Sequence, residues 1–373
     1  MDAQYNHRQL LSLMSLSALS PILRLYPGKA AELGGKAAWL SPLAALPVLL
    51  LYGALLARLY RRSLPGEGLP ELAARLLGPV GGRLLQGLLG LWLLLYGAFL
   101  LRAGAERFVV TAFPFARPAF FIVVLGLSLL PAALGKPRSL VRMARLLLPV
   151  VLVVVLALLA AGLLKAEESC LLPVTSEDLP RLALSAAVVI DLVSPMLYLP
   201  GFLLPGLKRE EKSLVGVLLW VTGLCLCLTL LGAAVLGRFG PELSARLSQP
   251  FFTLVRNLVL FRGLERMEAL VVSLWLFPDF LLGALLLGCS WNCLCPALGV
   301  DREREFLLPL LSGGRWLLWL CGAAMIALAL LLWPGKDGYH LWSETVIPLC
   351  NLSVAFLLLP GLCLLARQKE KRM

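Results

Sequence analysis

The chain has 373 residues, of which 60% are hydrophobic and only 15% charged, and its formal net charge at pH 7 is +12. Soluble globular domains carry about 45–50% apolar and about 25% charged residues, so this composition excludes a soluble protein and indicates an integral membrane protein. The positive charge does not indicate a nucleic-acid partner, because the basic residues are scattered over many loops. It is typical of a protein beside anionic lipid.

Apolar runs long enough to cross a bilayer, about 20 residues each, recur along the whole chain and predict ten transmembrane helices. Their approximate limits are 10–27, 38–57, 84–104, 118–134, 146–164, 182–204, 214–236, 266–290, 307–333 and 344–366.

Two segments need a separate interpretation. The segment 241–263 is apolar but contains three arginines, so we expect an interfacial helix or one packed over the bundle. The residues before the first span carry little positive charge, and no small-x-small cleavage site follows that span. We therefore interpret it as a retained helix and not as a signal peptide.

The distribution of basic residues predicts the orientation. If the N-terminus is cytoplasmic, more than half of the 34 basic residues lie in cytoplasmic segments, including the tail 367–373. The loop 165–181 on the opposite side is acidic. Because cytoplasmic loops are enriched in Lys and Arg, we expect both termini in the cytoplasm.

A Ser-Pro step interrupts two of the spans. Ser20-Pro21 in the first span is nearly repeated, with its apolar context, as Ser194-Pro195 in the sixth. Proline removes one backbone N–H and crowds the carbonyl four residues earlier, here those of Ser17 and Asp191. Paired interruptions in two halves of a membrane protein point to a transporter-type binding site, so we predict that helices 1 and 6 are broken there.

The polar residues of the spans are the candidates for this site. Ionisable groups at membrane depth are costly and by default functional. Asp191 either contacts a ligand or ion or makes a structural hydrogen bond to neighbouring helix ends, and Arg24 either faces the cavity or extends to the outer interface. The serines and tyrosines could also have only capping or packing roles. The predicted ligand-binding residues are Ser17, Ser20, Tyr96, Asp191, Ser194 and Tyr198.

The predicted breaks favour a zwitterionic ligand. The positive ends of the half-helices beginning near Pro21 and Pro195 favour a carboxylate. The freed carbonyls around Ser17 and Asp191, with the Asp191 side chain, favour an ammonium group. A small amino acid carries both groups.

Metal and enzyme chemistry are not indicated. The closest cysteines, Cys289, Cys293 and Cys295, lack the CxxC spacing and the histidines of zinc sites. The chain has no P-loop, no dinucleotide-binding glycine pattern and no credible catalytic triad. We expect no cofactor, no metal and no enzymatic activity.

Three motifs carry a family resemblance. Gly35-Lys36-Ala37-Ala38-Trp39-Leu40-Ser41 resembles the G-x-x-A-W-L/I-S sequence of spore germination permeases of the GerAB type. The stretch 249–256, followed by 264–270, is similar to that family's P-x-x-x-L-V-R and L-E-R-I/M-E/D-A sequences. Arg8-Gln9, leading to a span that ends at Leu25-Tyr26-Pro27, also fits. The resemblance covers the whole chain and departs from the family pattern at Ser20-Pro21 and Arg24.

The resemblance implies an all-helical, LeuT-like fold of the amino acid–polyamine–organocation superfamily. The chain, 1–373, would form one transmembrane domain of two inverted five-helix repeats, about 10–164 and about 182–366, with the ligand between helices 1 and 6. The implied role is that of the germinant-sensing subunit of a receptor in the spore inner membrane. Its implied partners are a small germinant, expected to be an amino acid, a larger membrane subunit and a lipoprotein subunit.

Three alternatives stay open at this stage. The chain could be an ion-coupled amino acid transporter that uses the same fold and site, or an assembly subunit whose site is no longer used. The third open question is the role of Glu265 and Glu268, which are three residues apart and share a helix face. That pair could be a docking surface, a gate latch or only a solvated helix start.

Overall fold

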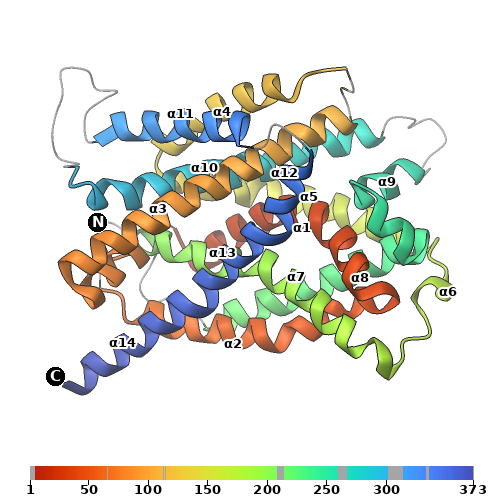
Figure 1. Cartoon of the computed structure of the whole chain (residues 1–373), viewed down its shortest axis with the longest axis horizontal. Coiled ribbons are helices and arrows are strands. Elements are labelled where there is room, and N and C mark those ends of the chain that lie inside the picture. The colour runs from red at the N-terminus through yellow and green to blue at the C-terminus, as the bar shows by residue number, and fades with distance from the viewer. Residues whose placement is uncertain are drawn as a thin grey trace.

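The computed structural model describes residues 5–207 without 65, 112 and 114, and residues 214–258, 267–300, 314–332 and 336–372. Helices make up nearly all of this part of the chain, and no β-strand occurs in it (Figure 1). The elements in order are α1 His7–Gly34, the 3-10 helix η1 Gly35–Leu40, α2 Ser41–Arg61, α3 Leu69–Thr111, α4 Pro118–Leu134, α5 Pro137–Leu163, α6 Glu168–Leu171, η2 Ser176–Asp178, α7 Leu179–Tyr198, the 3-10 helix η3 Leu199–Gly206, α8 Leu214–Arg246, α9 Pro250–Asn257, α10 Met267–Ala297, α11 Arg315–Leu331, α12 Lys336–Leu341, the π-helix η6 Trp342–Val346, α13 Ile347–Ser353, the π-helix η7 Val354–Leu358 and α14 Leu359–Arg372.

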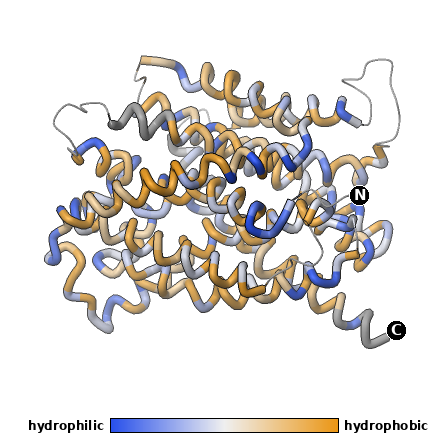
Figure 2. The backbone as a smooth tube through the Cα atoms, turned by 180° about the vertical axis from the view of Figure 1, so that it is seen from behind, coloured by the Kyte–Doolittle hydropathy of each residue, from blue (hydrophilic) through white to orange (hydrophobic). Residues whose placement is uncertain are grey.

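Seven helical stretches among the described residues are long and apolar enough to cross a membrane. The first, His7–Arg61, is 55 residues long and contains two of the predicted spans. Two further apolar helices, Pro118–Leu134 and Arg315–Leu331, are shorter. Hydrophobic residues dominate the helices, and hydrophilic residues gather at their ends and in the connections (Figure 2). The protein is therefore an all-helical membrane protein, and the number of ten crossings stays a prediction.

Helix α1 is at the centre of the packing and contacts α5, α7, α8 and α10. Helix α3 lies along α10 across the molecule (Figure 1) and also contacts α4 and α11. Helix α2 contacts α7 and α8. Because apolar side chains cover most of each helix, these contacts merge into one continuous buried core.

Helices α1 and α7 run antiparallel. Near one end of the pair, the Ser185 hydroxyl donates a hydrogen bond of 3.1 Å to the carbonyl of Ala30. Near the other end, the Tyr5 N–H donates to the carbonyl of Gly206 at 3.2 Å. A Cβ atom added at Gly34 would lie 2.8 Å from the Ser185 Cβ, so the close approach of the two helices requires glycine there.

The structure differs from the prediction at the two Ser-Pro steps. Pro21 lies inside α1, which continues to Gly34, and Pro195 lies inside α7, which ends three residues later. Each proline removes one helical hydrogen bond, but packing on both sides holds the remaining helix in place. The chain then changes to 3-10 geometry at Leu199. The two steps therefore weaken their helices without breaking them.

Gly-Pro steps break two other helices. Gly78, before Pro79 in α3, has φ 82°, and Gly240, before Pro241 in α8, has φ 71°. Glycine tolerates this positive φ, and the following proline lacks the N–H that would continue the helical pattern. Both steps are visible in the sequence as turn signals.

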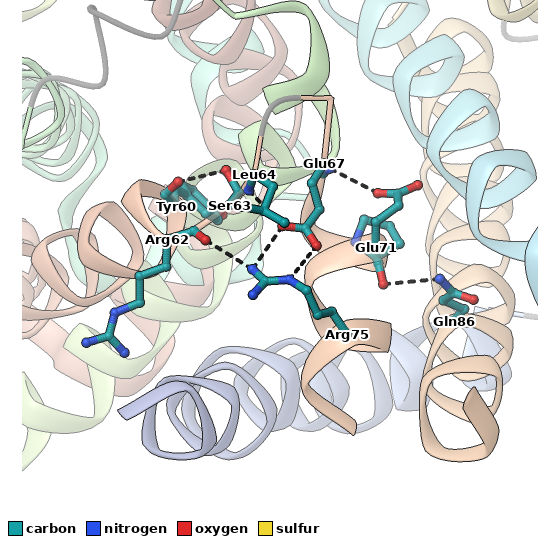
Figure 3. Close-up of polar contacts among 10 residues, drawn as sticks. Tyr60, Arg62, Ser63, Leu64, Glu67, Glu71, Arg75 and Gln86 are labelled. Atoms are coloured by element: carbon teal, nitrogen blue, oxygen red, sulfur yellow. Dashed lines mark hydrogen bonds and ion pairs between the residues drawn. The ribbon is translucent and has the colours of Figure 1, made fainter. Parts of the chain in front are cut away.

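A polar network fixes the connection between α2 and α3 (Figure 3). Arg75 forms an ion pair of 2.8 Å with Glu67 and donates a hydrogen bond of 3.0 Å to the carbonyl of Arg62. Gln86 donates to the carbonyl of Pro70 at 3.1 Å. These bonds orient the start of α3, which carries Tyr96 into the core.

Part of the segment 241–263 packs over the bundle. Helix α9 contacts α1, α5, α8 and α10, and Phe251, Phe252 and Leu254 are buried. Its last residues, 259–263, lie outside the described part of the chain. So do Glu265 and the side chain of Glu268, and the interpretation of this acidic pair stays a prediction.

Candidate functional site

Two helix faces, one on α1 and one on α7, each carry three buried polar residues of the core. On α1, Ser17, Ser20 and Arg24 follow one another at spacings of three and four residues, which places them on one face. On α7, Asp191 and Tyr198 share a face with Ser194 in the same way. All six side chains are buried.

The antiparallel contact between the helices sets the depth of the two charges. Arg24 lies six residues before Ala30, and Asp191 lies six residues after Ser185, where the two helices are hydrogen-bonded. The helical rise is the same on both sides, so Arg24 and Asp191 lie at the same level. A buried cation and a buried anion therefore lie at the same level of two helices in contact.

These two charges do not form an ion pair with each other. Asp191 Oδ1 instead accepts a hydrogen bond of 2.9 Å from the Asn351 side-chain amide in α13. Arg24 is only 5% exposed, and its Nε and Nη2 atoms have no hydrogen-bond partner within the described part of the chain. An unpaired buried charge is costly, so the Arg24 guanidinium favours a ligand that supplies an anionic partner.

Three buried aromatic residues of α3 and α7, Trp92, Tyr96 and Tyr198, are further candidates for the site. Tyr96 is buried and stacks on Trp92 with ring centroids 5.8 Å apart. The buried Tyr198 hydroxyl and Trp92 Nε1 approach each other, but neither makes a hydrogen bond of good geometry within the described part of the chain. Each unsatisfied buried polar group costs about 1–3 kcal/mol. We call Arg24, Trp92, Tyr96, Asp191, Tyr198 and Asn351 the central polar site.

A cavity of about 590 Å³ adjoins this site on the side of Arg24. It lies between α1, α3, α9 and the α12–η6 segment. Its lining includes both signs of charge, contributed by Arg24, Lys29, Glu32, Arg102, Glu106 and Glu344. Small-molecule sites usually measure about 300–1,000 Å³, so the cavity is large enough to admit an amino acid to Arg24.

A second polar cluster links α1 to α3 and α10. The Ser20 hydroxyl donates a hydrogen bond to Asp279 Oδ1, and Arg107 forms an ion pair with Oδ2 of the same carboxylate. The Arg107 side chain is fully buried and lies over the rings of Phe108 and Phe252. A Cβ at Gly104 would lie 3.2 Å from the carboxylate, so glycine leaves room for the pair.

The predicted site residues separate into two groups. Tyr96, Asp191 and Tyr198 meet in the central polar site, whereas Ser20 bonds to Asp279. The Ser194 hydroxyl donates a hydrogen bond of 3.3 Å to the carbonyl of Asp191. The Ser17 hydroxyl is buried and finds no partner among the described residues.

Four polar residues of the core were missed or only partly interpreted from the sequence. Arg24 does not extend to an outer interface but is buried. Asp279 and Arg107 are ionisable residues in or beside predicted spans, a signal that could have identified them. Asn351, in contrast, is a neutral residue inside an apolar run and gives no such signal.

Metal-binding groups of three or more His, Cys, Asp or Glu side chains do not occur among the described residues. None of the nine cysteines forms a disulfide, and Cys289, Cys293 and Cys295 are buried in the core. They contribute apolar packing there.

Comparison with known proteins identifies relatives of the chain and of its fold. Residues 5–290 match the model of the family described as "Spore germination protein". The fold is similar to that of MhsT in complex with L-phenylalanine, with a TM-score of 0.57 at 16% identity, covering 98% of both chains. It is also similar to MHP1, a nucleobase-cation-symport-1 family transporter with bromovinylhydantoin bound, with a TM-score of 0.57 at 12% identity over 94% of this chain and 78% of that one. No curated protein sequence matches the chain.

Proposed function

This chain belongs to the spore germination protein family of GerAB-type permeases, and we propose that it is the germinant-sensing membrane subunit of a spore germination receptor. Its structural neighbours are transporters of the LeuT fold. We further propose that the germinant is a small amino acid that binds in the central polar site, between the first and sixth spans, α1 and α7.

The observation that supports this proposal most is that Arg24 and Asp191 are both buried in the core but do not form an ion pair. The two opposite charges lie level on adjacent helices, yet each lacks the other as an ion-pair partner. The ammonium group of an amino acid would pair with Asp191, and its carboxylate would pair with the Arg24 guanidinium, which binds carboxylates in bidentate geometry. Because α1 and α7 are not broken, they have no half-helix ends to bind the carboxylate of the ligand. In this proposal the Arg24 guanidinium binds that carboxylate instead.

In this proposal, α1 and α7 bend at the two proline steps. Pro21 and Pro195 each leave one helical hydrogen bond unmade beside the bound ligand. We propose that ligand binding bends α1 and α7 at these points and shifts an equilibrium between two arrangements of the bundle. A ligand moves such an equilibrium only by its differential affinity for the two states, so about 2–3 kcal/mol of discrimination is required.

The receptor context is part of the same proposal. The larger membrane subunit and the lipoprotein subunit would detect the rearrangement of this chain in the spore inner membrane. The test is germination of spores that lack this gene, challenged with amino acids, nucleosides and sugars. Selective loss of the response to one amino acid class supports the proposal, and restoration by the wild-type gene but not by Asp191→Ala assigns it to this site. An unchanged response to every compound would contradict it.

A second function is favoured by the structural neighbours. MHP1 is a cation symporter, so the same fold in this chain could carry out ion-coupled amino acid transport. Reconstituted vesicles distinguish the two functions. Net uptake of labelled amino acid that depends on a proton or sodium gradient supports transport, whereas binding without net flux supports sensing.

A further inference from the structure

The start of α5 carries three arginines on one helix face. Arg138, Arg142 and Arg145 lie four and three residues apart, so their side chains project from the same side of the helix. All three are exposed. Val141, between them, is fully buried and holds this part of α5 against the bundle.

The arginines line a cavity between α5 and the beginning of α1. The cavity measures about 530 Å³, and Tyr5 and Gln9 complete its polar lining. The Tyr5 hydroxyl is fixed by a hydrogen bond to the carbonyl of Leu203. Among the described residues, no acidic side chain lines this cavity. No described carboxylate in the cavity therefore neutralises the three arginines.

The position of these charges on the helix is itself unfavourable. The N-terminal end of a helix has a partial positive charge, which favours acidic and not basic residues. Helix α5 has no acidic residue in its first turn and carries Arg138 there. An external anion bound at this end would interact favourably with the positive end of the helix dipole. It would also reduce the mutual repulsion of the arginines.

The same helix face continues as an exposed apolar stripe. Leu146, Val150 and Val153 follow Arg142 at helical spacing, and their exposed fractions are 76%, 55% and 66%. In a membrane, this stripe faces acyl chains, while the arginines lie at the level of the headgroups. A ligand that joins an anionic group to an apolar chain fits both parts.

We propose that this cavity is a binding site for an anionic phospholipid, whose phosphodiester is held by Arg138, Arg142 and Arg145 and whose acyl chain lies along Leu146, Val150 and Val153. Basic pockets between transmembrane helices bind anionic lipid headgroups in this way. The bound lipid contacts both α5 and the first residues of α1. It therefore stabilises the position of α1, the helix that carries Arg24. The stability of the protein then depends on the lipid composition of the membrane.

The test uses the full-length protein purified in a neutral detergent, with native mass spectrometry and thermal melting as the measurements. Phosphatidylglycerol is the anionic probe, and phosphatidylcholine is the zwitterionic control. The variant Arg138→Gln/Arg142→Gln/Arg145→Gln removes the site. The matched control, Arg83→Gln/Arg117→Gln/Arg181→Gln, removes the same charge from three exposed, scattered positions.

Wild type and the control variant should retain phosphatidylglycerol in preference to phosphatidylcholine and melt at a higher temperature in its presence. In the site variant the affinity should fall about a hundredfold, because each basic side chain near an anionic surface contributes about 1 kcal/mol. The single substitution Arg142→Gln, at the centre of the cluster, should cause an intermediate loss of affinity for phosphatidylglycerol. It replaces the triple variant in the test if the triple variant does not fold.

Three results would overturn the proposal. Equal retention of phosphatidylglycerol by the wild type and the site variant would show that the arginines do not bind it. An equal loss in the control variant would show that only net charge matters. Stabilisation by inorganic phosphate alone, equal to that by the lipid, would show that the acyl chain contributes nothing and that the site takes a free anion.

Discussion

Arg24 and Asp191 lie at the same depth on two antiparallel helices in contact, each six residues from the hydrogen bond that joins Ser185 to Ala30. Here Asp191 bonds to Asn351, and two nitrogen atoms of Arg24 stay unsatisfied within the described residues. The proposed ligand is a molecule that carries the complementary pair of charges.

The first prediction concerns the anion of the site. Asp191→Asn removes the negative charge but keeps a side chain that can still hydrogen-bond to Asn351. Hydrogen bonds to charged groups contribute about 1.5–3 kcal/mol, so germinant affinity should fall by about tenfold to a hundredfold. Titration of the purified variant by isothermal calorimetry measures this loss. Glu177→Gln, an exposed acid before α7, is the matched control and should bind normally. Normal binding by Asp191→Asn would remove Asp191 from the site.

The second prediction concerns the cation. Arg24→Gln should weaken binding of an amino acid by about tenfold or more, because the carboxylate loses a charged, bidentate partner. The same substitution should leave binding of the corresponding amine, which has no carboxylate, unchanged relative to wild type. Arg181→Gln, which removes an exposed charge, is the control. If Arg24→Gln weakens the amine and the amino acid equally, Arg24 does not contact the carboxylate.

The third prediction concerns the buried pair formed by Arg107 and Asp279. Arg107→Met leaves the Asp279 carboxylate without its cation in the core, and removing one partner of a buried pair costs about 3–5 kcal/mol. The double variant Arg107→Met/Asp279→Leu should recover part of this loss, because two apolar side chains need no partner, whereas the buried Ser20 hydroxyl loses its acceptor. Thermal melting in detergent compares the three proteins. A double variant no more stable than Arg107→Met would show that the pair is not the source of the loss.

The fourth prediction uses two tyrosine hydroxyls that differ in their bonding. The Tyr198 hydroxyl is buried and makes no hydrogen bond of good geometry among the described residues, so Tyr198→Phe should not lower the melting temperature. It should weaken ligand binding if the ligand uses that hydroxyl. The Tyr60 hydroxyl donates a hydrogen bond of 3.0 Å to the carbonyl of Tyr198, so Tyr60→Phe should cost about 1 kcal/mol of stability. Equal destabilisation by both substitutions would contradict this difference.

Much of the fold was predictable because the membrane restricts what a chain can form. Backbone polar groups in a bilayer must be satisfied internally, so long apolar runs predict helices, and the predicted ranges fall on helices wherever the chain is described. The helix breaks were not predicted correctly. Proline at 21 and 195 removes a single hydrogen bond, which surrounding packing outweighs, whereas Gly78-Pro79 and Gly240-Pro241 combine a positive φ with a missing donor.

The positions of the predicted site residues could be inferred from the sequence only in part. Asp191 is conspicuous as a carboxylate in an apolar run, and Tyr96 and Tyr198 do lie near it. Its partner Asn351 is 160 residues away in the chain, and no local pattern connects the two. The attachment of Ser20 to Asp279, 259 residues away, is equally invisible to local reasoning. Tertiary packing decides which polar residues meet.

The most direct test of the central claim measures the binding of one ligand in three forms to the purified wild-type protein. The forms are the amino acid that triggers germination, the amine that lacks its carboxylate and the acid that lacks its ammonium group. The account predicts measurable binding of the amino acid and binding weaker by at least about tenfold for each truncated form, because each loses one charged partner. Equal affinity for all three forms, or no binding of any of them, would contradict a site built on Arg24 and Asp191.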